Sequence, residues 1–287
     1  MNETDTFLNI VIPVLATLGT LIFGHYTKGK YKEKLLNSLS FLIPAFCALG
    51  IYLDQPSSLS YPLIIPDNMA IILISFAMLN FVSSKLKSNS TYPYLILSFI
   101  VLGISYPWMI QINVKWPYLI CSIILLTEGY YLSNKLQEIK HLNSYLFYVC
   151  SAITCISVSH STASISHVLM LVAITLPYAL YISYQTFIQK ENHNDSVFTL
   201  LIILISFNAC LRFVPDPDLP FTISLLPITG LTLFISSIFI FLLIKKNSLP
   251  LWFLLTICLV TSSLALYSYF YEAEGSESQS YDYGSYE

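Results

Sequence analysis

One acidic side chain, Glu128, lies well inside a long apolar stretch of the sequence. It follows Pro117 by eleven residues and precedes Lys135 by seven, so a helix through this stretch places it roughly 16 Å from the outer end. A carboxyl group at that depth of a bilayer is costly and commonly serves ion or proton movement. The structural alternatives are a neutral carboxyl that hydrogen-bonds a neighbouring helix, or a side chain that reaches the inner surface beside Tyr130 and Tyr131. The sequence leaves both roles open.

A second group of polar side chains stands near the outer ends of later apolar runs and comprises His160, His167, Asn208, Arg212 and Asp216. Asn208 and Arg212 are four residues apart and therefore share one face of a helix. If these residues converge, they form a polar vestibule or an anion-accepting site at the outer face. The simpler interpretation, which we favour, pairs Arg212 with a nearby aspartate and leaves the histidines in an ordinary exposed loop.

Motifs of the common enzyme classes are missing from the sequence. It has no Gly-x-Ser-x-Gly, no His-Glu-x-x-His, no phosphate-binding loop and no paired intramembrane aspartates of the prenyltransferase kind. Two histidines without further nearby ligands are a weak metal signal. The six cysteines fall inside apolar runs, and we interpret them as small hydrophobic residues rather than disulfides or metal ligands. We therefore predict no catalytic, cofactor-binding or metal-binding residue, and an enzyme is the less favoured class.

These few polar residues must be positioned by a very apolar chain. Of its 287 residues, 55% are hydrophobic and only 10% are charged, whereas a soluble domain carries about 25% charged residues. This composition excludes a soluble globular protein, binding of nucleic acid through a basic surface, and a sizeable catalytic domain outside the membrane. The fold class that remains is an all-α, polytopic integral membrane helix bundle, in which each span needs roughly 20 apolar residues.

Ten apolar runs approach the length of a membrane span. Runs six and seven are separated by only a few polar residues, so the count becomes nine if these two merge or one is re-entrant. Ten is the better count. We predict about ten transmembrane helices, at residues 7–25, 35–53, 67–84, 93–109, 117–133, 145–160, 164–188, 197–213, 220–244 and 250–271.

Basic residues are distributed unequally between the loops. Eleven of the 13 lysine and arginine residues fall in every second loop, and the other loops hold only Lys115 and Arg212. Because short loops rich in lysine and arginine stay in the cytoplasm, both chain ends are predicted to face the outside. An even number of helices preserves this alternation, which supports ten. The expected location is the plasma membrane, and specifically a bacterial inner membrane.

The last segment, residues 272–287, differs in character from the rest of the chain. It holds five acidic residues, three tyrosines and no basic residue, and it offers almost no apolar surface to bury. We therefore predict two regions, a transmembrane bundle over residues 1–271 and a disordered acidic tail over residues 272–287. The favoured interpretation of the tail is a solvated end without a partner, and the alternative is a segment that docks on another membrane subunit.

Three functions are compatible with this reading of the sequence. The favoured one is a permease for a small solute or a lipid-linked intermediate, which requires a polar cavity that reaches Glu128. The second is a non-catalytic integral subunit of a larger membrane complex. The third, a membrane-embedded enzyme acting at the outer face, needs His160, His167, Cys210 and Arg212 to converge. The expected partners are the lipid bilayer and, in the second case, other membrane subunits, and no nucleic acid is expected.

Overall fold

The computed structural model describes residues 3–27, 30–54, 65–86, 91–111, 116–135, 141–162, 165–189, 196–212, 221–244 and 249–279. Within these ranges the chain is almost entirely helical, and no residue forms a strand. The helices are α1 (Glu3–Tyr26), α2 (Lys30–Asp54), α3 (Ile65–Leu86), α4 (Thr91–Gln111), α5 (Trp116–Lys135), α6 (His141–Thr162), α7 (Ile165–Ser183), the π-helical turn η2 (Tyr184–Gln189), α8 (Ser196–Arg212), α9 (Phe221–Ser224), α10 (Leu226–Ile244) and α11 (Leu251–Gln279).

The long helices follow the predicted apolar runs. Among the described residues, ten helices have 17 residues or more, and each coincides with one run. Helices α6 and α7 are separate, so runs six and seven do not merge. Pro117 is the second residue of α5, where its missing N–H group is no loss to the helix. The prediction of an all-α fold is confirmed for the described part of the chain.

Three segments are long and apolar enough to cross a membrane, namely Val168–Ile188, Leu226–Ile244 and Leu251–Tyr271. Five further apolar helical segments have 10–17 described residues each. Length and composition therefore support a membrane protein with at least these three candidate spans.

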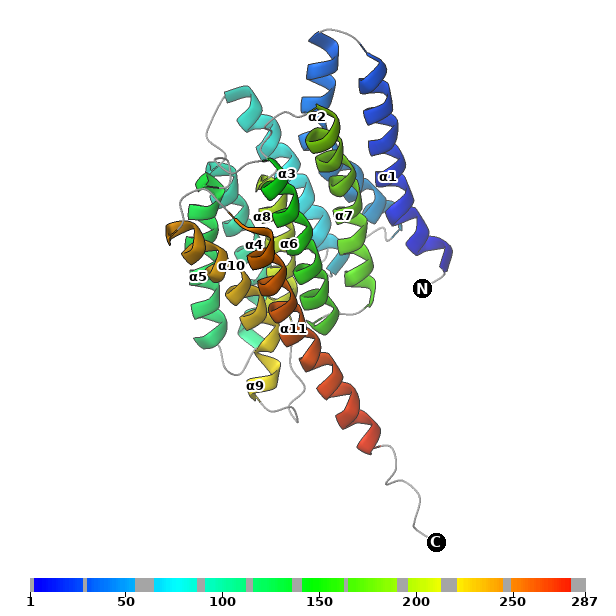
Figure 1. Cartoon of the computed structure of the whole chain (residues 1–287). Coiled ribbons are helices and arrows are strands. Elements are labelled where there is room, and N and C mark those ends of the chain that lie inside the picture. The colour runs from blue at the N-terminus through cyan, green and yellow to red at the C-terminus, as the bar shows by residue number, and fades with distance from the viewer. Residues whose placement is uncertain are drawn as a thin grey trace.

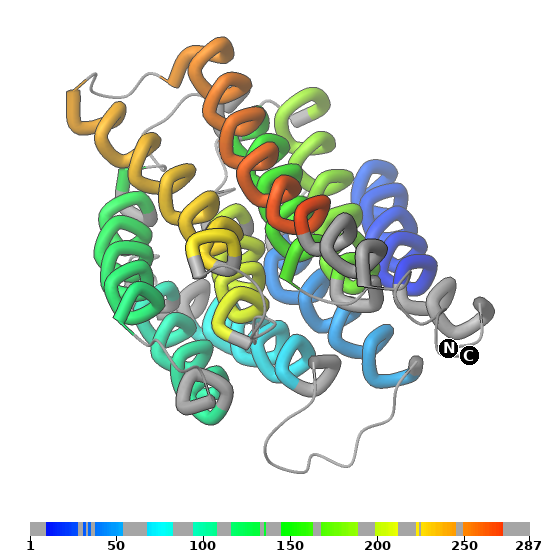
Figure 2. The backbone as a smooth tube through the Cα atoms, turned by 90° about the horizontal axis from the view of Figure 1, so that it is seen from below, coloured from blue at the N-terminus to red at the C-terminus, as the bar shows by residue number. Residues whose placement is uncertain are grey.

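The long helices lie roughly along one direction, and the chain reverses at each end of the bundle (Figure 1). Helices α1 and α2 pack as an antiparallel pair, and α7 packs against α1. Helices α5 and α10 lie together at the opposite edge, as both Figure 1 and Figure 2 show. The bundle thus has an α1–α7 edge and an α5–α10 edge.

Helix α8 is the core of the bundle. Every residue from 199 to 211 is buried, and the helix packs against α4, α5, α6, α7 and α10. A helix that is apolar on all sides is kept from water either in the core of a bundle or by lipid. The sequence of α8, which carries no charge before Arg212, fits this central position.

Helix α11 lies at the periphery and presents large apolar side chains to the outside. Trp252 is 65% exposed and Leu259 is 68% exposed. The helix continues to Gln279, eight residues into the segment predicted to be a disordered tail. This extension has a physical reason, because the Glu-Ala-Glu sequence at 272–274 favours helix and prolongs one that already exists. Residues 280–287 of the predicted tail lie outside the described residues.

Described lysines gather at one end of the bundle. Lys32 and Lys34 lie on the first turns of α2, and Lys135 ends α5. Because α1 and α5 run in the same direction and α2 returns along α1 (Figure 1), these lysines share the end at which α1 finishes. We call it the lysine-rich end. That it faces the cytoplasm stays a prediction.

Candidate functional site

Glu128 lies on the face of α5 that packs against α10. Its side chain is half-buried, and Oε2 accepts a hydrogen bond of 2.7 Å from Ser236 Oγ. One turn further along both helices, the rings of Tyr131 and Phe239 meet edge to face with centroids 4.9 Å apart. The two contacts advance together along the chain, so α5 and α10 run parallel. We call the interface formed by these four residues the α5–α10 seam.

The next residue, Gly129, sets the approach of α4 to α5. A Cβ atom at this position would overlap the hydroxyl group and the ring of Tyr94. Tyr94 is buried, and its hydroxyl donates a hydrogen bond of 3.3 Å to the carbonyl oxygen of Leu125. Glycine is needed here because the tyrosine ring occupies the space of a side chain. The backbone that carries Glu128 is therefore held between α4 and α10.

Two further polar side chains lie between Glu128 and the start of α5. Tyr118 and Cys121 precede Glu128 by ten and seven residues and lie on the same side of the helix. Cys121 lies beside Thr232 of α10, and Tyr118 lies beside Cys210 of α8. The hydroxyl of Tyr118 is buried without a hydrogen-bond partner among the described residues. Phenol, thiol and carboxyl groups thus follow one another over roughly 15 Å of one helix.

Asn208, a member of the predicted outer-face group, joins the central helix to α4. It is buried on α8, and its Nδ2 donates a hydrogen bond of 2.6 Å to Ser105 Oγ. Ser105 in turn donates to the carbonyl oxygen of Val101 at 2.7 Å. A short chain of hydrogen bonds therefore connects α8 with the backbone of α4.

His160, a second member of that group, faces another helix. Its ring lies against Tyr269 of α11, with the ring centroids 4.4 Å apart. Asn208 contacts α4 and His160 contacts α11, so the described contacts of these two residues are with different helices. Cys210, which the enzyme hypothesis needs beside His160, is buried next to Tyr118 of α5.

The side-chain positions of the other three members of the group lie outside the described residues. His167 lies on α7, and Arg212 is the last residue of α8. Their side chains lie outside the described residues, as does the whole of Asp216. The outer-face cluster stays a prediction for these three positions.

All six cysteines are buried and unpaired, in agreement with their interpretation as small core residues. Between α6 and α11, the thiol of Cys258 donates to the carbonyl oxygen of Cys150 at 3.5 Å, and Thr154 Oγ1 donates to Cys258 Sγ at 3.7 Å. Small polar groups of this kind allow membrane helices to pack closely. In the part of the chain that the structure describes, no three His, Cys, Asp or Glu side chains gather into a metal-binding group.

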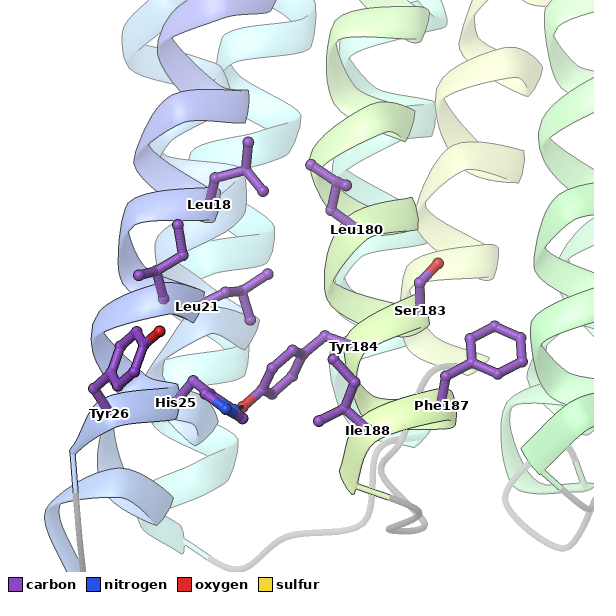
Figure 3. Close-up of a pocket in the computed structure, with 10 residues that line it drawn as sticks. Leu18, Leu21, His25, Tyr26, Leu180, Ser183, Tyr184, Phe187 and Ile188 are labelled. Carbon is purple, nitrogen blue, oxygen red and sulfur yellow. Dashed lines mark hydrogen bonds between the residues drawn. The ribbon is translucent and has the colours of Figure 1, made fainter.

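A feature that the sequence analysis missed is a groove between α1 and α7 (Figure 3). It has a volume of about 580 Å³, and its walls are mainly apolar side chains such as Leu18, Leu21 and Leu180. Near the end of α1, His25 Nδ1 and the Tyr184 hydroxyl lie 3.2 Å apart, within hydrogen-bonding distance. These two residues are 159 positions apart in the sequence, and no pattern in the sequence links them. We call this feature the α1–α7 groove.

The backbone of the groove departs from a regular helix at Tyr184, the first residue of the π-helical turn η2. Such turns are rare and are frequently found at functional sites. The next residue, Gln185, is fully buried, and neither atom of its amide group has a hydrogen-bond partner among the described residues. The irregular turn therefore coincides with the polar end of the groove.

A comparison of the chain with family models, with curated proteins and with solved structures gives no match. In the seam, the carboxyl group of Glu128 can take up and release a proton between two helices. At the groove, the imidazole of His25 and the phenol of Tyr184 can bind the polar part of a ligand.

Proposed function

We propose that this protein is a multi-pass permease of a bacterial inner membrane and that Glu128 exchanges a proton while a small solute is transported. The observation that carries the proposal is the hydrogen bond between Glu128 and Ser236, which joins the interior of α5 to the middle of α10. Helix α10 is the most apolar of the three candidate spans. An ionisable group beside such a helix is costly to keep, and its usual role is functional.

The proposal includes ten membrane spans with both chain ends outside. Ten long helices alternate in direction within one bundle, and the shortest, α8, has 17 residues. At 1.5 Å per residue it is roughly 26 Å long, close to the thickness of the hydrocarbon core, which is about 30 Å. The unequal distribution of lysine and arginine between alternate loops supports this orientation.

Protonation would change the contact that joins the two helices. An ionised Glu128 only accepts hydrogen bonds, and Ser236 supplies one. A protonated carboxyl group also carries a donor, so Ser236 can become the acceptor. The seam therefore has two hydrogen-bond arrangements, and a solute that favours one of them shifts the protonation of Glu128. Tyr118, Cys121 and Thr232 supply polar groups between Glu128 and the outer end of α5.

A second candidate function is a non-catalytic subunit of a larger membrane complex. The observation that favours it is the outer surface of α11, because only 28% of an 18-residue apolar stretch of this helix is buried in this chain. A helix of a partner subunit would cover the apolar side chains of this surface, such as Leu259. Lipid tails would cover them equally well, so we rank this function second.

Transport can be tested with the purified full chain in liposomes that contain a pH-sensitive dye. Amino acids, sugars and small organic acids are added one at a time under an imposed proton gradient. We expect at least one solute to drive proton movement in the wild type and at least a tenfold slower movement in Glu128→Gln, which keeps the shape of the side chain but loses its ionisable proton. Ser236→Ala should retain partial activity, and the control Glu272→Gln, outside the seam, should retain full activity.

Two results would contradict the proposal. Solute-driven proton movement that persists in Glu128→Gln removes Glu128 from the mechanism. A wild type that moves protons with none of the solutes, and that co-purifies from its membrane in a stable ratio with a second integral protein, favours the subunit function.

A further inference from the structure

The α1–α7 groove lies at the periphery of the bundle and is open on one side. Apolar side chains point into it from both helices (Figure 3). Two of the lining residues are largely uncovered in this chain, with Ile22 57% exposed and Ile188 57% exposed. Its volume of about 580 Å³ lies within the range of small-molecule sites, about 300–1,000 Å³.

The groove also has a direction, from an apolar part to a polar end. The apolar part begins at Leu18 and gives way to the polar end at His25, seven residues further along α1, which is about 10 Å. The polar end coincides with the last turn of α1 and therefore with the lysine-rich end of the bundle. Tyr26 and Tyr31 are 79% and 76% exposed there, and exposed tyrosines are typical of the headgroup level of a membrane.

Positive charge accompanies the polar end. Lys34 is exposed and Lys32 is partly exposed on the first turns of α2, the helix that packs against α1. Basic side chains beside a crevice between membrane helices are a recurring site for anionic lipid headgroups. The contact between His25 Nδ1 and the Tyr184 hydroxyl holds the two walls together at this level and offers polar atoms to a phosphate group.

We propose that the α1–α7 groove binds one anionic phospholipid from the leaflet at the lysine-rich end. An acyl chain lies between α1 and α7, against Leu18, Ile22, Leu180 and Ile188. The phosphate lies at the level of His25 and Tyr184, where the positive charge of Lys32 and Lys34 attracts it. This site goes beyond the proposed transport function, because it lies on other helices than the α5–α10 seam and requires no proton exchange by Glu128.

The proposal is tested on the purified full chain by native mass spectrometry, with titration of either phosphatidylglycerol or phosphatidylcholine in detergent. We expect a single phosphatidylglycerol to bind with high affinity and phosphatidylcholine to bind at least tenfold more weakly. Each lysine near an anionic membrane surface contributes about fivefold to binding. The double variant Lys32→Gln/Lys34→Gln should therefore lose about 25-fold in affinity for phosphatidylglycerol and bind phosphatidylcholine unchanged.

Two variants fill the groove from opposite walls. Ile22→Trp and Ile188→Trp replace partly exposed side chains, so each protein should fold, and thermal unfolding in lipid-free detergent checks this. Both variants should bind phosphatidylglycerol with at least tenfold lower affinity than the wild type. The matched control is Leu259→Trp, a similarly exposed position on α11, which should bind like the wild type.

Two outcomes overturn the proposal. Equal binding of the two lipids by the wild type removes the anionic headgroup from the site. Loss of binding in the lysine variant, with full binding in both folded tryptophan variants, shows that the lysines attract lipid at the surface and that the groove is not used. Neither outcome bears on Glu128, whose role is measured by proton movement.

Discussion

The α5–α10 seam and the α1–α7 groove lie at opposite edges of the bundle, and they are built in opposite ways. In the seam, Glu128 is turned toward a neighbouring helix and bonded to Ser236, while Tyr94 closes the other side of α5. In the groove, the apolar side chains of α1 and α7 border an open space, and a polar contact between His25 and Tyr184 lies at one end of it.

This difference teaches where stability and ligand binding should reside. A closed interface with internal hydrogen bonds suits a small cargo such as a proton, and substitutions in it should weaken the fold. An open apolar groove suits a molecule with a long apolar part, and substitutions in it should weaken binding while the fold persists. Three measurements can break or sharpen this contrast, and a fourth sets it against a hydrogen bond between α8 and α4.

The largest expected effect is all-or-none and concerns membrane sidedness. Trp116, the first residue of α5, is 72% exposed, and Lys34 is exposed on the first turns of α2, at the lysine-rich end. A membrane-impermeant maleimide added to intact cells should label Trp116→Cys and leave Lys34→Cys unlabelled. The native cysteines are all buried and should not react with the maleimide.

Inverted vesicles provide the control for this labelling experiment, because the two positions should exchange their behaviour. Labelling of Lys34→Cys from outside intact cells would reverse the predicted orientation. It would also move the groove to the outer leaflet.

The next largest effect is expected at Gly129. Gly129→Ala forces a methyl group into the hydroxyl and ring of buried Tyr94, and overpacking of this kind costs roughly 1–3 kcal/mol. Thermal unfolding in detergent should show the loss. The matched control is Gly103→Ala, also within a helix, where a Cβ meets nothing within 4 Å. There alanine should stabilise by about 0.5–1 kcal/mol because glycine is the poorer helix former.

A comparable or smaller effect is expected when the seam loses its carboxyl group. Glu128→Leu leaves the Ser236 hydroxyl without its acceptor, at a cost of roughly 1–3 kcal/mol. Replacing both partners, in Glu128→Leu/Ser236→Ala, should recover most of the stability because no polar group is then left unpaired. If the double variant is as unstable as the single one, the hydrogen bond is not what holds the seam.

The smallest effect concerns the bond between Asn208 and Ser105. Hydrogen bonds between membrane helices contribute about 0.6 kcal/mol on average. A double-mutant cycle with Asn208→Ala and Ser105→Ala should therefore give a coupling near this value in unfolding experiments. A coupling of zero would mean that Asn208 acts through packing alone.

The sequence predicted the helices much better than it predicted which helices meet. The apolar runs located the ten long helices because length and apolarity are local properties. Glu128 was found because a carboxyl group stands out in such a run, whereas its partner Ser236 is a common residue on a distant helix. The pairing depends on the packing of α5 against α10, which no local pattern specifies.

The same limit explains the outer-face group and the groove. Asn208 and His160 were grouped because they lie near the same ends of the predicted helices, but depth in the membrane does not tell which helix each side chain faces. His25 and Tyr184 come together only because α7 packs against α1, and the π-helical turn at Tyr184 has no signal in the sequence. The sequence therefore identified which side chains could do chemistry, but it did not predict which side chains lie next to one another.

The burial of residues 199–211 of α8 has a consequence for the order in which the protein is assembled. Of the helices that pack closely on α8 in the described part of the chain, only α10 follows it; α4, α5, α6 and α7 are made earlier. Translation therefore produces α8 after four of these five neighbouring helices. The hydrogen-bond partner of the buried Asn208, Ser105 of α4, has already been synthesised at that point, and α10 is the last of these helices to pack on α8.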